Sequence, residues 1–349
     1  MHMADALISP AVGGTMWATS AGLIAWCARK VKGVCDDRLV PMMGVMGAFI
    51  FASQMINFSI PGTGSSGHLG GGLILTILLG PHAAFLAIAS VLTVQALFFA
   101  DGGLLALGCN VFNLGFFPAF VAYPLIYRPI AGARRAGGRA WTAAIVAAVA
   151  GLQLGAFGVV VETKLSGISE LPFGTFLMVM QPIHLAIGVV EGLATAAVVE
   201  FVARVRPEAI ATTPAAALGQ RSLRPVLAGL LVAAALAGGG LNWFASSHPD
   251  GLEWSISKLT GKEELEGSGD GPRGPAARIQ EKTAFLPDYG FRPAESKPAP
   301  AESSAGPGAG PWPAVSAGTS VSGIVGGLIT LIVAGLIGYL LKRGGRTTT

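Results

Sequence analysis

The feature that most constrains this chain is the length of its apolar runs, several of which continue for about 20 residues with almost no charge. An α-helix needs about 20 apolar residues to cross the hydrocarbon core of a bilayer. Charged residues make up 12% of the 349 residues, whereas soluble proteins contain roughly 25%. Backbone polar groups inside lipid must be satisfied within their own segment, which favours helices. The sequence therefore predicts an all-α polytopic membrane protein.

The apolar runs predict about seven membrane helices, followed after a polar linker by two more. We expect them at residues 9–28, 41–60, 69–80, 82–100, 107–127, 140–161, 173–203, 224–245 and 320–341. The third run is short for a span and fits a tilted or partly re-entrant element. This pattern divides the chain into a first membrane domain at 1–205, a cytoplasmic linker at 206–223 and an auxiliary domain at 224–349.

Lys and Arg are concentrated in alternate loops, and this asymmetry predicts the orientation of the helices. The basic segments are residues 29–39, 128–139, 204–224 and 342–346. With nine helices all four fall on one side, and an excess of Lys and Arg marks cytoplasmic loops. We therefore expect a multi-pass protein of the inner cell membrane with its carboxyl terminus in the cytoplasm. Its amino terminus, loop 61–68 and segment 246–319 would then lie outside, with a short amphipathic helix after Asp250.

Several classes of function find no support in the sequence. The patterns of a P-loop, a serine-hydrolase nucleophile elbow and a zinc-protease helix are all missing. The chain is therefore not expected to be an enzyme or to hydrolyse ATP by itself. A net charge of +4, carried mostly by short loops beside apolar runs, does not indicate nucleic-acid binding.

Histidine at position 2 gives the amino terminus an unusual capacity to hold a metal ion. The α-amine of Met1, the backbone nitrogen of His2 and the imidazole of His2 can reach one ion in adjoining chelate rings. A second imidazole could close the remaining corner of a square, and an all-nitrogen square suits Ni(II) or Cu(II). Considered by itself, a histidine at this position is more often an accident of sequence.

His68 is the candidate for the second imidazole. It lies in a glycine-rich loop, Gly-Thr-Gly-Ser-Ser-Gly-His-Leu-Gly-Gly-Gly at 62–72, whose backbone can approach other segments closely. The predicted topology places this loop on the same face as His2. The alternative is a loop histidine without a functional role.

Polar side chains also gather beside His68 and at the outer ends of predicted helices. They are Gln54, Asn57, Ser66, Gln95, Asp101, Asn110 and Asn113. Because polar groups in lipid need partners, hydrogen bonding between helices is one interpretation. The other is a set of groups that fixes the amino-terminal segment and orients His68, as metal ligands require.

Two further arrangements suggest other functions. His184 and Glu191 lie seven residues apart on one face of the predicted helix 173–203, and intramembrane ionisable groups are candidate functional sites. We favour a structural polar pair between helices, and the alternative is the transport site of an ion-coupled secondary carrier. Ser65 or Ser66 with His68 could form part of a hydrolase, but no third member or oxyanion site is visible.

The beginning of the chain, Met-His-Met-Ala-Asp-Ala-Leu-Ile-Ser-Pro, resembles that of the nickel and cobalt substrate-binding subunits of energy-coupling-factor transporters. Further similar stretches lie at 66–71, 79–81, 95–104 and 106–113, and the match covers about residues 1–205. The family usually begins Met-His-Ile-Pro-Asp-Gly, from which Met3, Ala4 and Ala6 depart. Pro-Asp-Gly-Leu-Glu at 249–253 resembles the motif of the auxiliary subunit that accompanies nickel forms, here fused to the first domain.

The resemblance implies a metal ion held by the Met1 amine, the His2 amide nitrogen, the His2 imidazole and the His68 imidazole. It also implies partners, namely a transmembrane coupling subunit and cytoplasmic ATPase subunits that drive uptake. Ni(II) is the expected substrate, favoured by the loop around His68 and the fused motif, and Co(II) uptake by the same architecture is the alternative. No organic cofactor is implied.

Overall fold

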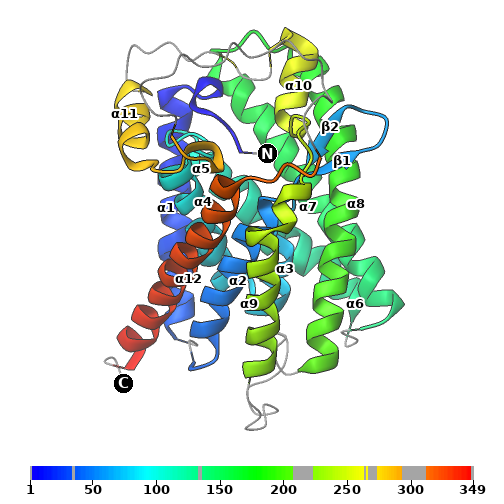
Figure 1. The fold of residues 1–349 in the computed structure, drawn as a ribbon, viewed down its shortest axis with the longest axis vertical. Coiled ribbons are helices and arrows are strands. Elements are labelled where there is room, and N and C mark those ends of the chain that lie inside the picture. Colours follow the sequence, from blue (N-terminus) through cyan, green and yellow to red (C-terminus); the bar gives the residue numbers. More distant parts are fainter. Residues whose placement is uncertain are drawn as a thin grey trace.

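The computed structural model describes residues 2–33, 36–132, 136–206, 223–262, 265, 273–292 and 312–346. Helices account for nearly all of its regular structure (Figure 1). In chain order the elements are η1 (Asp5–Leu7), α1 (Pro10–Lys32), α2 (Leu39–Gln54), β1 (Phe58–Ile60), β2 (Ser65–Gly67), α3 (Gly72–Leu79), α4 (Pro81–Phe99), α5 (Leu107–Val111), η2 (Phe112–Tyr127), α6 (Arg128–Ala131), α7 (Gly138–Ser166), α8 (Phe173–Val205), α9 (Arg224–Gly239), η5 (Leu241–Phe244), α10 (Gly251–Thr260), α11 (Arg273–Thr283), η6 (Pro287–Tyr289) and α12 (Ala317–Arg346). The predicted short helix after Asp250 is confirmed as α10.

Each predicted apolar run contains a helix, but the predicted count of seven plus two spans is not confirmed. Within the described residues, five helical stretches are long and apolar enough to cross a membrane. These are Pro81–Phe99, Leu107–Ala131, Gly138–Ser166, Phe173–Val205 and Ala317–Gly345. By contrast, α2 and α9 have 16 residues each and α3 has only eight, a length of about 12 Å.

Local backbone geometry explains why α3 and α2 are shorter than the predicted spans. Helix α3 ends after two turns because Gly80 adopts a φ of 81° and Pro81 starts α4 in a new direction. The run 41–60 leaves the helix early because residues 58–60 form a strand. This strand pairs antiparallel with β2, so that Phe58 lies opposite Gly67, and the hairpin reaches the residue before His68.

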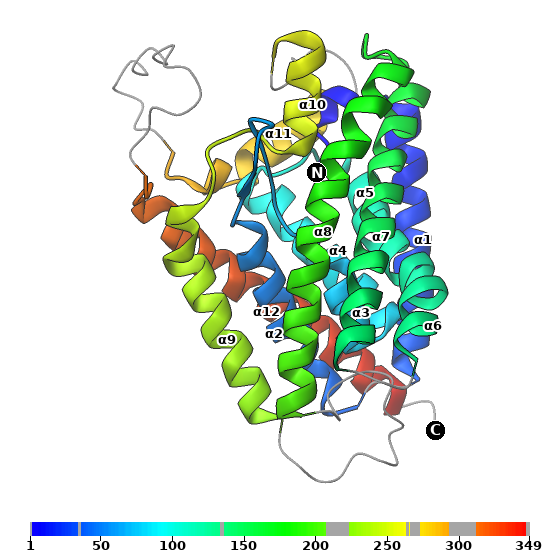
Figure 2. The same ribbon diagram turned by 90° about the vertical axis from the view of Figure 1, so that its right-hand side faces the viewer.

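The two helices of the auxiliary domain, α9 and α12, pack against the first domain (Figures 1 and 2). Close approach of backbones makes this contact: a Cβ added at Gly44 of α2 would lie 2.8 Å from the carbonyl oxygen of Leu331 in α12. The two auxiliary helices also approach each other closely, since a Cβ at Gly238 of α9 would lie 2.9 Å from the backbone of Gly323 in α12. Small residues at such crossings favour helix association in lipid. The fused segment is therefore part of the same helical body.

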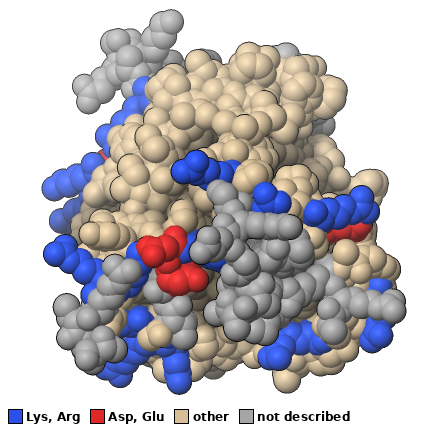
Figure 3. All heavy atoms as spheres, turned by 90° about the horizontal axis from the view of Figure 1, so that it is seen from below, with Lys and Arg blue, Asp and Glu red and all other residues tan. Residues whose placement is uncertain are grey.

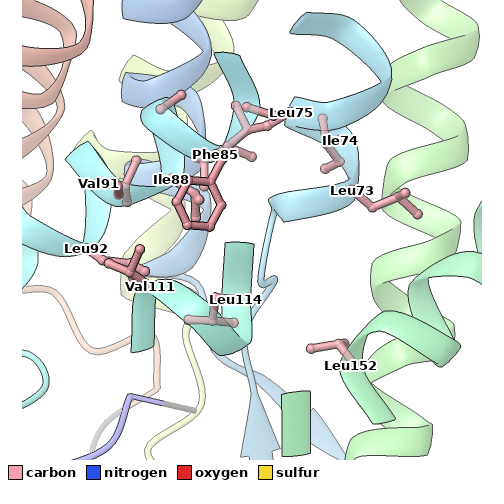
Figure 4. Close-up of a cluster of buried hydrophobic side chains, with 14 of the residues drawn as sticks. Leu73, Ile74, Leu75, Phe85, Ile88, Val91, Leu92, Val111, Leu114 and Leu152 are labelled. Carbon is pink, nitrogen blue, oxygen red and sulfur yellow. The ribbon is translucent and has the colours of Figure 1, made fainter. Parts of the chain in front are cut away.

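A cluster of buried apolar side chains holds the centre of the bundle (Figure 4). It joins Leu73 of α3 to Phe85 of α4, Leu114 of η2 and Leu152 of α7, each at most 6% exposed. All eight residues of α3 are buried. The loop that contains His68 leads directly into α3, and the carboxyl-terminal end of this loop is therefore anchored in the core.

Basic side chains are concentrated at the end of the molecule where the carboxyl terminus lies (Figures 1 and 3). They come from the helix ends and loops there, and are Arg29, Lys30, Lys32, Arg38, Arg128, Arg139, Arg204, Arg206, Arg224, Lys342 and Arg343; the other described basic side chains, in α7 and the segment 251–292, are Lys164, Lys258, Lys262, Arg278, Lys282 and Arg292. The amino-terminal segment, the β hairpin, α10 and α11 lie at the opposite end (Figure 1). Most of the linker 206–223 lies outside the described residues. The basic segments and the two histidines of interest are thus at opposite ends of the bundle.

Candidate metal site

The amino-terminal segment is held against α5 by hydrogen bonds between its backbone and the side chain of Asn110. The Met3 N–H donates to Asn110 Oδ1 at 2.8 Å, and Asn110 Nδ2 donates to the Met3 carbonyl at 3.2 Å. The Gly103 N–H donates to the same carbonyl at 2.9 Å, and Met3 is fully buried. Met1 lies outside the described residues. The position of His2 therefore depends on Asn110, one of the polar residues singled out from the sequence.

His2 meets His68 in the structure, although the two are 66 positions apart in the sequence. The two imidazole rings stack with centroids 5.0 Å apart and planes inclined by 18°. His2 Nδ1 lies 2.8 Å from Asp101 Oδ1, while His2 Nε2 is buried and has no hydrogen-bond partner among the residues that the structure describes. The two imidazoles proposed to share a metal ion are thus neighbours, and Asp101 orients the first.

A residue of the auxiliary domain supports Asp101 in turn. The Tyr289 hydroxyl donates to Asp101 Oδ2, and the Tyr289 ring stacks on Phe99 at 5.1 Å. Burial raises the pKa of Asp101, but the electrostatic interaction with His2 and the hydrogen bonds from His2 and Tyr289 lower it more strongly. The net result is a pKa well below the usual range, so Asp101 is an ionised carboxylate.

His68 is held in the tautomer that a metal ligand requires. His68 Nδ1 lies 3.0 Å from the Leu69 carbonyl oxygen, and because a carbonyl can only accept, Nδ1 carries the hydrogen. The lone pair is therefore on Nε2. Burial lowers the pKa of His68 to about 3, which keeps the ring neutral at physiological pH. A neutral imidazole with one nitrogen bonded to a carbonyl is a common arrangement of metal-binding histidines.

The loop that follows His68 is anchored by two polar side chains within the bundle. The N–H groups of Gly70 and Gly71 donate to the Glu191 carboxylate at 2.8 and 3.1 Å. Gln54 Nε2 donates to the Gly70 carbonyl at 2.9 Å, and Gln95 Nε2 donates to Gln54 Oε1 at 2.9 Å. These bonds fix the backbone two residues beyond the imidazole.

Glu191 and His184 are both buried, and each is hydrogen-bonded to its own partner. His184 Nδ1 lies 2.8 Å from the Met180 carbonyl, whereas Glu191 accepts from the loop described above. Seven residues correspond to about 10 Å along a helix, so the two side chains have separate surroundings. The structural polar role expected for these two residues stays a prediction.

The remaining polar candidates have different surroundings. Asn57 lines a cavity of about 560 Å³ that reaches both histidines, and the Ser66 hydroxyl donates to the His248 carbonyl at 2.7 Å. Asn113 instead donates to Glu162 of α7 at 2.7 Å, not to the amino-terminal segment. It lies one turn after Asn110, and sequence alone did not distinguish the two.

The residues of the auxiliary domain that line this site were not among the site residues predicted from the sequence. Asp250, Gln280 and Tyr289 all border the cavity beside His2 and His68. The capping sequence Asp-Gly-Leu-Glu was the available signal for Asp250, but nothing in the sequence indicated its spatial neighbour. Among the described residues, no three His, Cys, Asp or Glu side chains are grouped so that they could hold a metal ion.

Comparison with known proteins finds matches to two family models in this chain. Residues 2–209 match the family described as the cobalt uptake substrate-specific transmembrane region, and residues 224–343 match the PDGLE domain. A protein of Archaeoglobus fulgidus, named as a fused nickel transport protein, is 33% identical over 347 residues, covering 99% of this chain and all of the relative. The fused nickel transport protein NikMN of Rhodobacter capsulatus is 31% identical, covering 83% of this chain and 88% of its own length.

A solved crystal structure of a transition metal transporter is also similar. Its sequence is 30% identical and the TM-score is 0.53, with 60% of this chain and 95% of that chain covered. The matched families and the fused relatives cover both halves of the chain, including the segment that borders the two histidines. This chain therefore belongs to the family of cobalt uptake substrate-specific transmembrane proteins, in the fused NikMN-type form that carries a PDGLE domain.

Proposed function

We propose that this chain is the substrate-specific subunit of an ATP-driven uptake transporter for Ni(II), bound through nitrogen atoms of Met1, His2 and His68. The observation that carries the proposal is the stacking of the His2 and His68 rings at 5.0 Å. The names of the fused relatives, both nickel transport proteins, support the same substrate.

The chelate proposed for the amino terminus explains why Asp101 faces His2. Adjoining chelate rings through the His2 backbone nitrogen can only be closed by Nδ1 of its imidazole. Asp101 Oδ1 lies 2.8 Å from this same nitrogen and so keeps the ring at the site. On binding, the ion replaces Asp101 as the partner of Nδ1, and His68 Nε2 supplies the fourth nitrogen. An all-nitrogen square is suited to Ni(II).

The proposal includes the orientation and the partners of the chain. The basic end of the bundle would face the cytoplasm, which puts the histidines at the extracytoplasmic end. Since no nucleotide-binding motif is found in the sequence, uphill transport would rely on a transmembrane coupling subunit and cytoplasmic ATPase subunits. Both kinds of subunit would bind at or near the basic end, because the ATPase subunits are on the cytoplasmic side.

Co(II) is the second candidate substrate, because the matching family is described as a cobalt uptake region and a 31% identical relative is named a cobalt transport protein. An ion-coupled secondary carrier is less favoured. Its proposed ionisable group, Glu191, is occupied by two backbone N–H bonds to the His68 loop.

The test compares Ni(II) and Co(II) binding, by isothermal titration, between the native chain and a variant with Gly-Ser placed ahead of Met1. We expect the extension to abolish high-affinity binding, because it converts the terminal amine into an amide. His2→Ala should do the same by removing the imidazole. Unchanged binding in both variants would refute the amino-terminal site and direct attention to the cavity carboxylates.

A further inference from the structure

The PDGLE motif lies directly on the strand that leads to His68. The Ser66 N–H donates to the Pro249 carbonyl at 2.8 Å, and the Ser66 hydroxyl donates to the His248 carbonyl at 2.7 Å. In the hairpin turn between β1 and β2, the Thr63 carbonyl accepts a hydrogen bond from Trp254 Nε1 at 3.0 Å. The motif is thus fixed to β2 at the position two residues before the imidazole.

The local structure of α10 turns the Asp250 carboxylate toward His68. Asp250 Oδ1 accepts from the N–H groups of Leu252 and Glu253 at 2.8 and 2.9 Å, and Glu253 Oε2 accepts from the Asp250 N–H at 2.8 Å. This is a capping box, which fixes the side chain at the start of the helix. The second oxygen, Oδ2, lies 3.9 Å from His68 Nε2.

The distance between His68 Nε2 and Asp250 Oδ2 suits two ligands of one metal ion. At 3.9 Å it is too long for a hydrogen bond. A transition-metal ion bonds imidazole nitrogen and carboxylate oxygen at about 2.0–2.2 Å, so two such ligands on opposite sides of one ion lie about 4 Å apart. His68 Nε2 is the atom that carries the lone pair, as argued from its Nδ1 contact with Leu69. The pair is therefore spaced to hold one divalent cation between them.

The cavity next to this pair is lined by carboxylates that attract cations. Its volume is about 560 Å³, and it reaches both His2 and His68. Its walls include five carboxylates, which are Asp5, Asp101, Asp250, Glu253 and Asp288. The unpartnered His2 Nε2 is buried in the same region. A divalent ion that still retains water would be attracted here by charge before it meets the nitrogen ligands.

We propose that Asp250 of the PDGLE motif is a capture ligand that binds the incoming ion next to His68 and passes it to the amino-terminal nitrogens. The inference rests on the proposed function and extends the metal site to the auxiliary domain. Asp250 replaces a water of the hydrated ion while His68 binds on the other side. The terminal amine, the amide nitrogen and His2 then take over, because an all-nitrogen square favours Ni(II) over oxygen ligands.

The test is the rate of Ni(II) binding to the full chain in nanodiscs, measured by stopped-flow absorbance. Asp250→Asn keeps the helix cap, since Asn caps as well as Asp, but removes the carboxylate. We expect the association rate constant to fall at least tenfold while the absorption spectrum of the final complex stays unchanged. Glu253→Gln is the matched control, because it removes the same charge from the same cavity and Gln also completes a capping box. Its rate should stay within twofold of native.

An unchanged rate in Asp250→Asn would overturn the proposal. Equal slowing in both variants would also overturn it, because the effect would then come from the general charge of the cavity. If Asp250→Asn fails to fold, Asp250→Ser, which also caps the helix, is measured in its place. The proposed function is tested separately by His2→Ala: native Ni(II) affinity in that variant would refute the nitrogen site whatever the rate with Asp250→Asn.

Discussion

The side chain of Asn110 offers a quantitative test of how the amino terminus is positioned. Its amide makes two hydrogen bonds to the backbone of Met3, the residue directly after His2. Asn110→Leu removes both bonds while keeping the number and branching of the side-chain heavy atoms. We expect the variant to fold and reach the membrane, but to hold the amino-terminal segment loosely and to bind Ni(II) more weakly.

The size of the effect follows from the partners that remain. The Met3 carbonyl still accepts from Gly103 at 2.9 Å, so losing the Asn110 bond to it costs little. The buried Met3 N–H loses its acceptor, and an unsatisfied buried donor costs about 1–3 kcal/mol. If this destabilises the docked conformation of the amino-terminal segment by about 2 kcal/mol, the affinity for Ni(II) falls roughly 30-fold.

Isothermal titration of Ni(II) into both purified chains measures this loss directly. Asn113→Leu is the matched control, since Asn113 lies one turn later and donates to Glu162 instead. That variant should be less stable to heat but should retain native affinity. The reasoning fails if Asn110→Leu binds Ni(II) as tightly as the native chain, or if both variants lose affinity equally.

Two other predictions concern pH and the anchor of the His68 loop. Because the His2 amide must lose a proton on binding, and the α-amine also does so below its ordinary pKa of about 8, Ni(II) affinity should fall ten- to a hundredfold per pH unit below that value. His68, with its pKa lowered to about 3, is neutral above that pH and adds nothing to this fall; titrations between pH 8 and 6 that show no change would contradict a deprotonated amide. Glu191→Gln leaves one of the Gly70 and Gly71 N–H groups without a good acceptor and should destabilise the fold by about 1–3 kcal/mol, seen as a lower melting temperature. Metal uptake in liposomes that contain the coupling and ATPase subunits should persist in this variant, and its complete loss with an unchanged melting temperature would instead favour the secondary carrier.

Some features of the fold were predictable because their causes are local. Long apolar runs predicted the positions of the helices, and the Asp-Gly-Leu-Glu sequence predicted the start of α10. The number of spans was not predictable in the same way. Whether α3 is a full span or a short two-turn helix depends on the φ of 81° at Gly80 and on the neighbours that bury it. Composition does not record either of these.

The candidate site shows the same division. The sequence by itself determined that Met1 and His2 can chelate one ion, because their nitrogens are separated by fixed covalent bonds. Only the tertiary structure decided that Asn110 holds Met3, that Glu191 anchors Gly70, and that Tyr289 supports Asp101, across separations of 107, 121 and 188 residues. Such partners are chosen by the packing of whole helices, and no periodicity along the chain specifies which side chains then face each other.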